Sequence, residues 1–341
     1  MPPRAADLRI GISGWTYPPW RGVFYPQDWV QKRELEYASR QVNSIEINGS
    51  FYSLQLPSSY QTWRDATPPG FLFSVKGGRF ITHMKKLRDV EVPLANFFAS
   101  GVLCLGKKLG PFLWQLPPNL SFDPMRLASF FRLLPRNGEE AEALAENHDA
   151  KVRGRAWTRA EGVGRLRHCL EVRHPSFVTP EFISLLREHD IGLVVADTAG
   201  KWPFLEDVTS DFVYVRLHGD EELYVSGYTP TALDGWARKI RSWSAGRNPR
   251  EAVRIAGPMA GSPRNVFVYF DNDVKVHAPF DAISLAYRLG LCREPGCKPD
   301  LSKVTEEARL DWPGIRSRWR GIGARVVPIR KQPRRATRSR A

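Results

Sequence analysis

Eight short runs of hydrophobic residues recur along the chain, separated by longer polar and amphipathic stretches. The runs are rich in Val, Ile, Leu, Phe and Tyr and lack the strict alternation of a half-exposed strand, which is typical of strands buried on both faces of a parallel sheet. The predicted strands are residues 8–13, 42–47, 71–76, 112–116, 168–173, 191–197, 212–218 and 266–271.

Amphipathic segments between these runs carry helix signals, such as Pro in the first turn. The predicted helices are residues 57–67, 93–105, 123–134, 179–190, 230–243 and 278–289. Strands that alternate with helices pair in parallel, and eight such units predict an α/β fold, a closed (β/α)8 TIM-type barrel. An open dinucleotide-binding sheet is disfavoured, because the first turn, GISGW at residues 11–15, puts a Trp where a pyrophosphate would approach the backbone.

Three segments depart from the alternation. Residues 137–164 are long, charged and contain several Gly, which predicts an insertion between strands four and five that carries a helix at 139–146. Residues 198–211 are too short for a full helix with its connections, and residues 246–265 are predicted to be a loop.

Charge is unevenly distributed along the 341 residues. The formal net charge is +14, but residues 316–341 hold ten Lys or Arg and no acid, which leaves +4 for the rest. We therefore expect a single barrel domain over residues 1–310 and a basic tail over residues 311–341. Such a tail either binds nucleic acid or another anionic surface in a salt-dependent way or acts as a solvated solubility tail.

Composition excludes several classes of protein. With 42% hydrophobic and 25% charged residues the chain can bury a large core and is not wholly disordered. It contains no run of 18 apolar residues and no apolar signal core at its start, so we expect a cytoplasmic protein without a transmembrane segment. The cysteines Cys104, Cys169, Cys292 and Cys297 fit reduced thiols, and their spacing does not favour a zinc site.

Polar side chains follow the hydrophobic runs at their carboxyl ends, although a strand buried on both faces should stay apolar. Because residues two apart on a strand face the same side, Glu171 and Arg173 are predicted to face the barrel interior, as are Arg216 and His218. The other strand ends contribute Glu46, Asn48, Lys76, Gln115, Asp197 and Asp271. These groups predict a site at the C-terminal mouth, where barrels of this type build their active sites.

Cations beside carboxylates suit an anionic substrate, since the planar fork of arginine matches phosphate and carboxylate. The candidate anion-binding residues are Lys76, Arg173, Arg216 and His174. Glu171 and Asp197 are candidate bases and His218 is a candidate acid, while Glu46 and Asn48 would orient the reacting groups. The leading hypothesis is an enzyme that performs acid–base chemistry on a phosphate-bearing or other anionic substrate.

Other interpretations of the same residues stay open. The charges can form a self-satisfied ion-pair network in which Glu171 serves only Arg173 or Arg216. A non-catalytic nucleic-acid-binding protein, using the basic tail and aromatic residues near the mouth, is another hypothesis. A further alternative is a divalent metal site that resembles those of isomerase, epimerase and apurinic-site endonuclease barrels, although the nearby cations disfavour a metal cofactor. Its ligands would be Glu171, Asp197, His218 and Asp271.

Aromatic residues gather after the first, second and seventh predicted strands. They are Trp15, Tyr17, Trp20, Phe24, Tyr25, Trp29, Phe51, Tyr52, Tyr224 and Tyr228. Such a rim either stacks on sugars or bases or packs on itself as a hydrophobic lid. Trp15 and Tyr52 are the stronger candidates for ligand contact, whereas Trp20 and Trp29 fit a lid equally well. Further hydrogen-bonding groups nearby are Ser50, Thr82 and His83.

A series of motifs recurs at successive strand ends. In order they are Gly11-Ile12-Ser13-Gly14-Trp15, Glu46-Ile47-Asn48, Phe51-Tyr52, Lys76, Gln115-Leu116-Pro117-Pro118, Glu171-Val172-Arg173-His174, Asp197 and Tyr214-Val215-Arg216-Leu217-His218-Gly219. This series, within residues 8–289, resembles the YecE-like family, domain of unknown function 72. The resemblance implies a (β/α)8 barrel with a polar mouth and does not imply an agreed reaction.

The chain departs from that family's pattern at a few positions. Ser50 stands where Thr is frequent, Phe177 where Trp is common, and Asp271 where Asn is usual before Asn272. If the last position is ordinarily an amide, an obligate carboxylate ligand there is doubtful and the metal alternative weakens. Asn272 and Gln115 complete the set of candidate substrate-binding groups.

Overall fold

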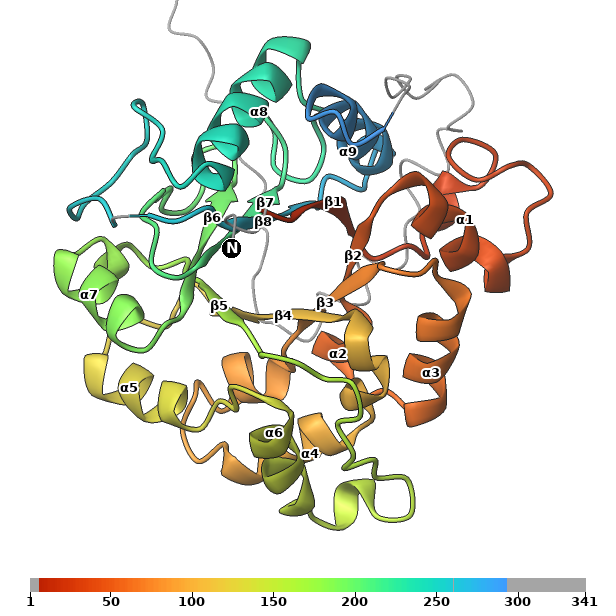
Figure 1. Cartoon of the computed structure of the whole chain (residues 1–341), viewed down its shortest axis with the longest axis vertical. Helices are drawn as coiled ribbons and strands as arrows, with labels where there is room; N and C mark the ends of the chain where they lie inside the picture. The colour runs from red at the N-terminus through yellow and green to blue at the C-terminus, as the bar shows by residue number, and fades with distance from the viewer. Residues whose placement is uncertain (1–5, 260, 293–341) are drawn as a thin grey trace, which may run out of the picture. The chain divides into compact units, whose positions relative to one another are not determined.

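A closed barrel of eight parallel strands forms the centre of the protein (Figure 1). The structure is a computed structural model that describes residues 6–259 and 261–292. The strands follow one another in chain order and the last pairs with the first, which confirms the predicted (β/α)8 architecture. They are β1 Leu8–Ser13, β2 Ser44–Ile47, β3 Leu72–Lys76, β4 Leu109–Gln115, β5 His168–Glu171, β6 Gly192–Asp197, β7 Phe212–Leu217 and β8 Asn265–Phe270.

Helices surround the barrel (Figure 1). They are α1 Glu34–Gln41, α2 Gly49–Tyr52, α3 Pro57–Ala66, α4 Glu91–Ala99, α5 Pro124–Arg132, α6 Gly138–Glu146, α7 Pro180–Glu188, α8 Pro230–Ser244 and α9 His277–Arg288. Side-chain oxygens cap several of them by accepting a backbone N–H three residues further on, which satisfies a donor that the helix itself leaves unpaired. The capping residues are Asp123 for α5, Asn137 for α6, Thr179 for α7 and Thr229 for α8.

Two helix assignments from sequence were wrong. The predicted helix at 93–105 ends at Ala99, because Gly101 takes a left-handed φ of 114° and the chain continues as 3₁₀ turns. A side chain at Gly101 would place its Cβ 2.4 Å from the Cα of Pro57, so only glycine fits. Helix α1 was missed, because its buried face includes a charged residue, Glu34, which pairs with Arg21 at 2.7 Å.

The irregular segments agree with the pattern in the sequence. Residues 137–164 carry α6, which packs against α4. Residues 198–211 and 246–265 contain no helix in the part that the structure describes. The expected domain boundary at 310, the basic tail and Cys297 lie outside the described residues. Among the described helices, none combines the length and the apolar character that a membrane span needs.

The lower part of the barrel is filled by side chains from β4 to β8. This core contains Leu113, Cys169, Val194, Ala196, Phe212, Tyr214, Phe267 and Tyr269, each no more than 4% exposed. Two of its members end in hydroxyl groups that need partners: Tyr214 bonds to Ser74 and Tyr269 to Ser44, both at 2.7 Å. This layer forms the floor on which the charged groups of the C-terminal mouth rest.

Candidate functional site

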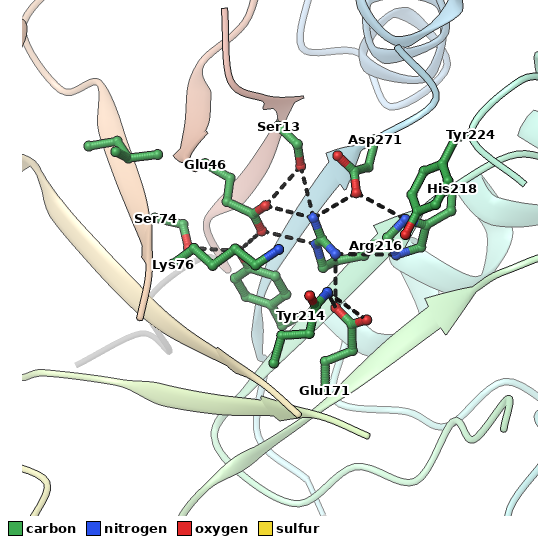
Figure 2. A network of polar contacts seen from close by, with 12 residues as sticks. Ser13, Glu46, Ser74, Lys76, Glu171, Tyr214, Arg216, His218, Tyr224 and Asp271 are labelled. Carbon is green, nitrogen blue, oxygen red and sulfur yellow. Dashed lines mark hydrogen bonds and ion pairs between the residues drawn. The ribbon is translucent and has the colours of Figure 1, made fainter. Parts of the chain in front are cut away.

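Arg216 on β7 occupies the centre of the mouth (Figure 2). Its side chain is fully buried and pairs with three carboxylates from three other parts of the barrel. The Nη2 atom lies 2.8 Å from Glu46 and 2.9 Å from Asp271, and Nη1 lies 2.9 Å from Glu171. The guanidinium is therefore paired with internal partners, and the role of Arg216 in binding a substrate anion stays a prediction.

Glu46 on β2 has both carboxylate oxygens occupied. Beyond the two contacts with Arg216 it accepts hydrogen bonds from Ser13 at 2.9 Å and from Tyr214 at 2.6 Å. The side chain is fully buried between these groups. Glu46 therefore holds the Arg216 side chain in place, and its predicted role in the reaction stays a prediction.

Glu171 at the end of β5 is equally saturated. Gln115 donates to both of its oxygens at 2.9 and 2.8 Å, and Arg173 donates at 3.0 Å. Burial alone would raise the pKa of Glu171, but Arg173 and Arg216 outweigh it and hold this pKa well below its ordinary value. Gln115 and Arg173 thus orient the Glu171 carboxylate, and the predicted roles of Glu171 as a base and of Gln115 as a substrate contact stay predictions.

His218 lies behind Arg216 and is fully buried. Its Nε2 atom is 3.3 Å from Nη1 of Arg216, which can only donate, so the imidazole proton belongs on Nδ1, 3.0 Å from Asp271. Burial and the charge of Arg216 lower the pKa of His218. The ring of Tyr224 packs edge-on against it at 5.2 Å. Nε2 faces Arg216 and Nδ1 lies at ion-pair distance from Asp271, and the role of His218 as an acid toward a substrate stays a prediction.

Asp197 does not join this cluster. The side chains of Val194 and Ala196 fill the barrel interior, so the alternation along β6 turns Asp197 toward the helices. There it accepts a hydrogen bond from the hydroxyl of Tyr228 at 3.0 Å, and burial raises its pKa. Asp197 is therefore absent from the ion pairs around Arg216, and its role as a base stays a prediction.

Two residues beyond the last strand positions also point elsewhere. His174 accepts the backbone N–H of Ser176 at 3.2 Å and so caps a short 3₁₀ turn. Asn272 donates to Asp281 at 2.9 Å and to the backbone of Ser226 at 3.0 Å, which fixes the loop after β7. Strand alternation no longer controls side-chain direction past the end of the ladder, and the substrate-binding roles of His174 and Asn272 stay predictions.

The aromatic residues mostly pack on one another. The ring of Trp15 lies 5.2 Å from that of Trp63 on α3, so this candidate for ligand contact packs in the helix layer instead. Trp20 is fully buried and lies 4.6 Å from the ring of Tyr17, which fits the lid interpretation. Tyr52 is 47% exposed, and its role as a ligand contact stays a prediction.

Lys76 at the end of β3 differs from the other charged groups. It is only 8% exposed, yet its ammonium makes no hydrogen bond or ion pair with any residue that the structure describes. Its Nζ atom lies 4.6 Å from the centre of the Phe51 ring. Burial and nearby Arg216 lower the pKa of Lys76 to about 8, although carboxylates in the cluster pull the other way.

Asp271, like Lys76, has a polar atom without a hydrogen-bond partner among the described residues. Its Oδ2 atom is held by Arg216 and His218, whereas Oδ1 has no hydrogen-bond partner among the described residues and the side chain is 14% exposed. Figure 2 shows this oxygen on the side away from Arg216. Burial would raise the pKa of Asp271, but Arg216 and His218 bring it to about 2, so the group is ionised at neutral pH.

The side of the mouth between β3 and β5 has a positive electrostatic environment. The Arg173 guanidinium lies 3.8 Å from the centre of the Trp202 ring and 3.5 Å from the Tyr224 hydroxyl, in addition to its pairing with Glu171. Burial, followed by the charges of Lys76, Arg173 and Arg79, lowers the pKa of His83 to about 3. His83 is therefore a neutral hydrogen-bonding group.

Asp273 is a buried acid that the sequence reasoning missed. Its Oδ1 atom is buried without a hydrogen-bond partner, and the carboxyl bonds to the hydroxyl of Tyr17. Burial and the charge of Asp271 raise the pKa of Asp273 well above its ordinary value. The spacing of two acids around Asn272, directly after the last strand, was the available signal. Asn48, by contrast, is half-buried and bonds to none of the cluster residues.

The four residues considered as metal ligands do not form a ligand set. Arg216 lies between Glu171 and Asp271, and Asp197 faces the helices. Within residues 6–259 and 261–292, no group of three or more His, Cys, Asp or Glu side chains is arranged to hold a metal ion. The guanidinium of Arg216 occupies the position between these carboxylates where a metal ion would have to bind.

These features define the class of protein. A parallel eight-stranded barrel with charged side chains gathered at the carboxyl ends of its strands is a TIM-type barrel with a polar C-terminal mouth. The family described as "Protein of unknown function DUF72" matches residues 9–303, and the chain belongs to this family. The family resemblance inferred from the strand-end motifs is thereby confirmed.

Individual relatives are more distant. The UPF0759 protein YecE of Escherichia coli is 28% identical over 127 residues, which cover 37% of this chain and 43% of that protein's length. A DUF72 family protein of Thermotoga maritima has a similar fold, with a TM-score of 0.60, 22% identity, and coverage of 83% of this chain and 99% of that one. One from Enterococcus faecalis has a TM-score of 0.59 and 16% identity, covering 85% and 98%.

Proposed function

We propose that the protein is an enzyme that binds a phosphate-bearing or other small anionic substrate at the C-terminal mouth and acts on it by acid–base chemistry. The observation that supports this is Lys76, a buried ammonium without a hydrogen-bonding or ion-pairing partner among the described residues. The decrease of its pKa from 10.5 to about 8 means that burying the charged form costs about 3 kcal/mol of folding free energy. An anionic ligand would supply the missing partner.

The three carboxylates around Lys76 already have arginine partners. Arg216 and Arg173 serve the carboxylates of Glu46, Glu171 and Asp271, each at hydrogen-bonding distance. The ion-pair network considered from the sequence therefore accounts for most of these charges but leaves Lys76 out. In the proposed function the ion-pair network is a rigid support. Lys76, together with Arg173, is the group that binds the ligand.

Lys76 also has the most suitable pKa for proton transfer. A group with a pKa of about 8 is mostly protonated at neutral pH and can give its proton to a departing or newly formed anion. The open Oδ1 of ionised Asp271 can accept a hydrogen bond from a substrate hydroxyl and orient it. In this proposal Lys76 and Asp271 are the groups that donate a proton and orient the substrate, in place of Glu171, Asp197 and His218.

Calorimetric titration of the full chain with inorganic phosphate at pH 7 tests the proposal. We expect saturable binding by the natural protein and at least tenfold weaker binding by Lys76→Met. Lys107→Met is the matched control, because Lys107 is exposed and precedes β4 at the opposite end of the barrel. The proposal fails if the natural protein binds neither phosphate nor a carboxylate such as acetate, or if both variants bind phosphate equally.

A further inference from the structure

We propose that Arg79, on the loop that follows β3, completes the mouth as a subsite for a phosphate dianion, so that the ligand is a phosphomonoester rather than a carboxylate. This inference rests on the proposed function and specifies the substrate class for the same site. Nothing in the strand-end pattern indicated Arg79, because it comes from a loop.

The chain turns sharply between Lys76 and Arg79. A Cβ on Gly77 would lie 2.2 Å from the ring of Trp114, so the backbone passes this close only without a side chain, whereas at Gly78 the nearest atom is 3.8 Å away. Arg79 then precedes the short π-helical turn Phe80–Met84. Gly77 therefore lets the backbone pass close to Trp114 where the chain leaves β3.

Arg79 has no ion-pairing partner among the described residues. Its Nε atom is buried without a hydrogen-bond partner, and its side chain makes no hydrogen bond or ion pair with any described residue. Arg216, in contrast, is surrounded by carboxylates, and Arg173 shares one with it. A guanidinium carries five donors in a planar fork, so an unpaired one beside a pocket is suited to a planar or tetrahedral oxyanion.

Arg79 and Lys76 act on the same small region. Both lie close enough to His83 for their charges to lower its pKa, together with Arg173. The Nδ1 atom of His83 lies 2.9 Å from the hydroxyl of Thr82, which leaves Nε2 without a described partner. Two uncompensated cations and a neutral imidazole thus converge near the end of β3.

Charge decides between ligand classes. A phosphomonoester carries between about −1.5 and −2 at neutral pH and a carboxylate carries −1, so the former can pair directly with both Lys76 and Arg79, neither of which has an ion-pair partner among the described residues. The additional oxygens of phosphate can also take the two-pronged hydrogen bonds of arginine while one oxygen meets the ammonium. A phosphodiester, with a single charge, would leave one cation unpaired.

The experiment compares three probes on the full chain: inorganic phosphate, dimethyl phosphate and acetate, each titrated by calorimetry at pH 7.5. We expect phosphate to bind at least tenfold more tightly than the other two. Arg79→Met should reduce phosphate affinity at least tenfold and remove most of this preference, while Arg79→Lys should keep part of it. Arg88→Met is the control, because Arg88 is an exposed arginine of the same connection.

The outcomes separate this inference from the proposed function. If Lys76→Met loses phosphate binding and Arg79→Met binds as tightly as the natural protein, the dianion subsite is wrong and the anion site stands. If dimethyl phosphate or acetate binds as well as phosphate, the ligand is not a phosphomonoester. If none of the probes binds the natural protein, the proposed function itself falls. Thermal unfolding of each variant verifies its fold, and Arg79→Lys provides the reading if Arg79→Met is unstable.

Discussion

Replacing Lys76 with Met should make the fold more stable at neutral pH. Methionine keeps the length and most of the volume of the side chain but removes a charge that the surroundings disfavour. The pKa of Lys76 falls from 10.5 to about 8 in the folded protein, and the side chain is only 8% exposed, so solvent screening is weak. The corresponding gain in the free energy of unfolding is about 3 kcal/mol at pH 7.

The pH dependence of this gain has a definite sign. Because the folded pKa lies below the unfolded value, the unfolded chain binds the extra proton between about pH 8 and 10.5. The free energy of unfolding of the natural protein therefore rises with pH across this window relative to the variant. The gap of about 3 kcal/mol at pH 7 should shrink to about 1 kcal/mol at pH 10.

Urea unfolding followed by tryptophan fluorescence, in phosphate-free buffer at pH 7 and pH 10, measures both gaps. Lys107→Met, at an exposed position, should show no gap at either pH. A Lys76→Met variant that is less stable than the natural protein at pH 7 would refute the reasoning, since Lys76 would then be a structural tie rather than an uncompensated charge.

Three further outcomes follow from the same structure. Arg216→Met should lower the free energy of unfolding by about 3–5 kcal/mol or prevent folding, because it leaves carboxylates buried without their partner; urea unfolding measures the loss, and an unchanged midpoint would contradict the network. Asp273→Asn should raise the unfolding midpoint at pH 7 with a gain that vanishes toward pH 4, because burial and Asp271 keep this carboxyl protonated while the unfolded chain ionises near pH 3.8; a midpoint lowered at pH 7 would contradict this. Removing residues 312–341 should abolish any affinity for nucleic acid and its salt dependence, measured by fluorescence anisotropy at several salt concentrations, without changing phosphate binding by the barrel; undiminished nucleic-acid affinity would place that binding elsewhere.

The barrel and much of the ion-pair cluster could be predicted from the sequence. Hydrophobic runs located every strand, and alternation correctly turned Glu46, Glu171 and Arg216 inward. The same rule failed for Asp197, where it should have been counted from Ala196, and it had no power beyond the strand ends, at His174 and Asn272.

What the sequence did not contain was the pairing of the charges. Glu46 and Arg216 lie 170 residues apart, and only the closure of the barrel decides that they neutralise each other. Lys76 looked equivalent to Arg216 in the sequence, yet one is saturated and the other has no partner among the described residues. Arg79 and Asp273 come from loops, where no periodicity marks a functional side chain.

The layer of tyrosine hydroxyls beneath the cluster has a consequence for the way a ligand enters and leaves the barrel. Tyr214 and Tyr269 close the barrel from below through their bonds to Ser74 and Ser44, so the mouth is a cup with a solid bottom rather than a conduit. In the proposed function, a ligand enters and leaves by the C-terminal mouth. Turnover would then depend on how fast the ligand dissociates from the mouth.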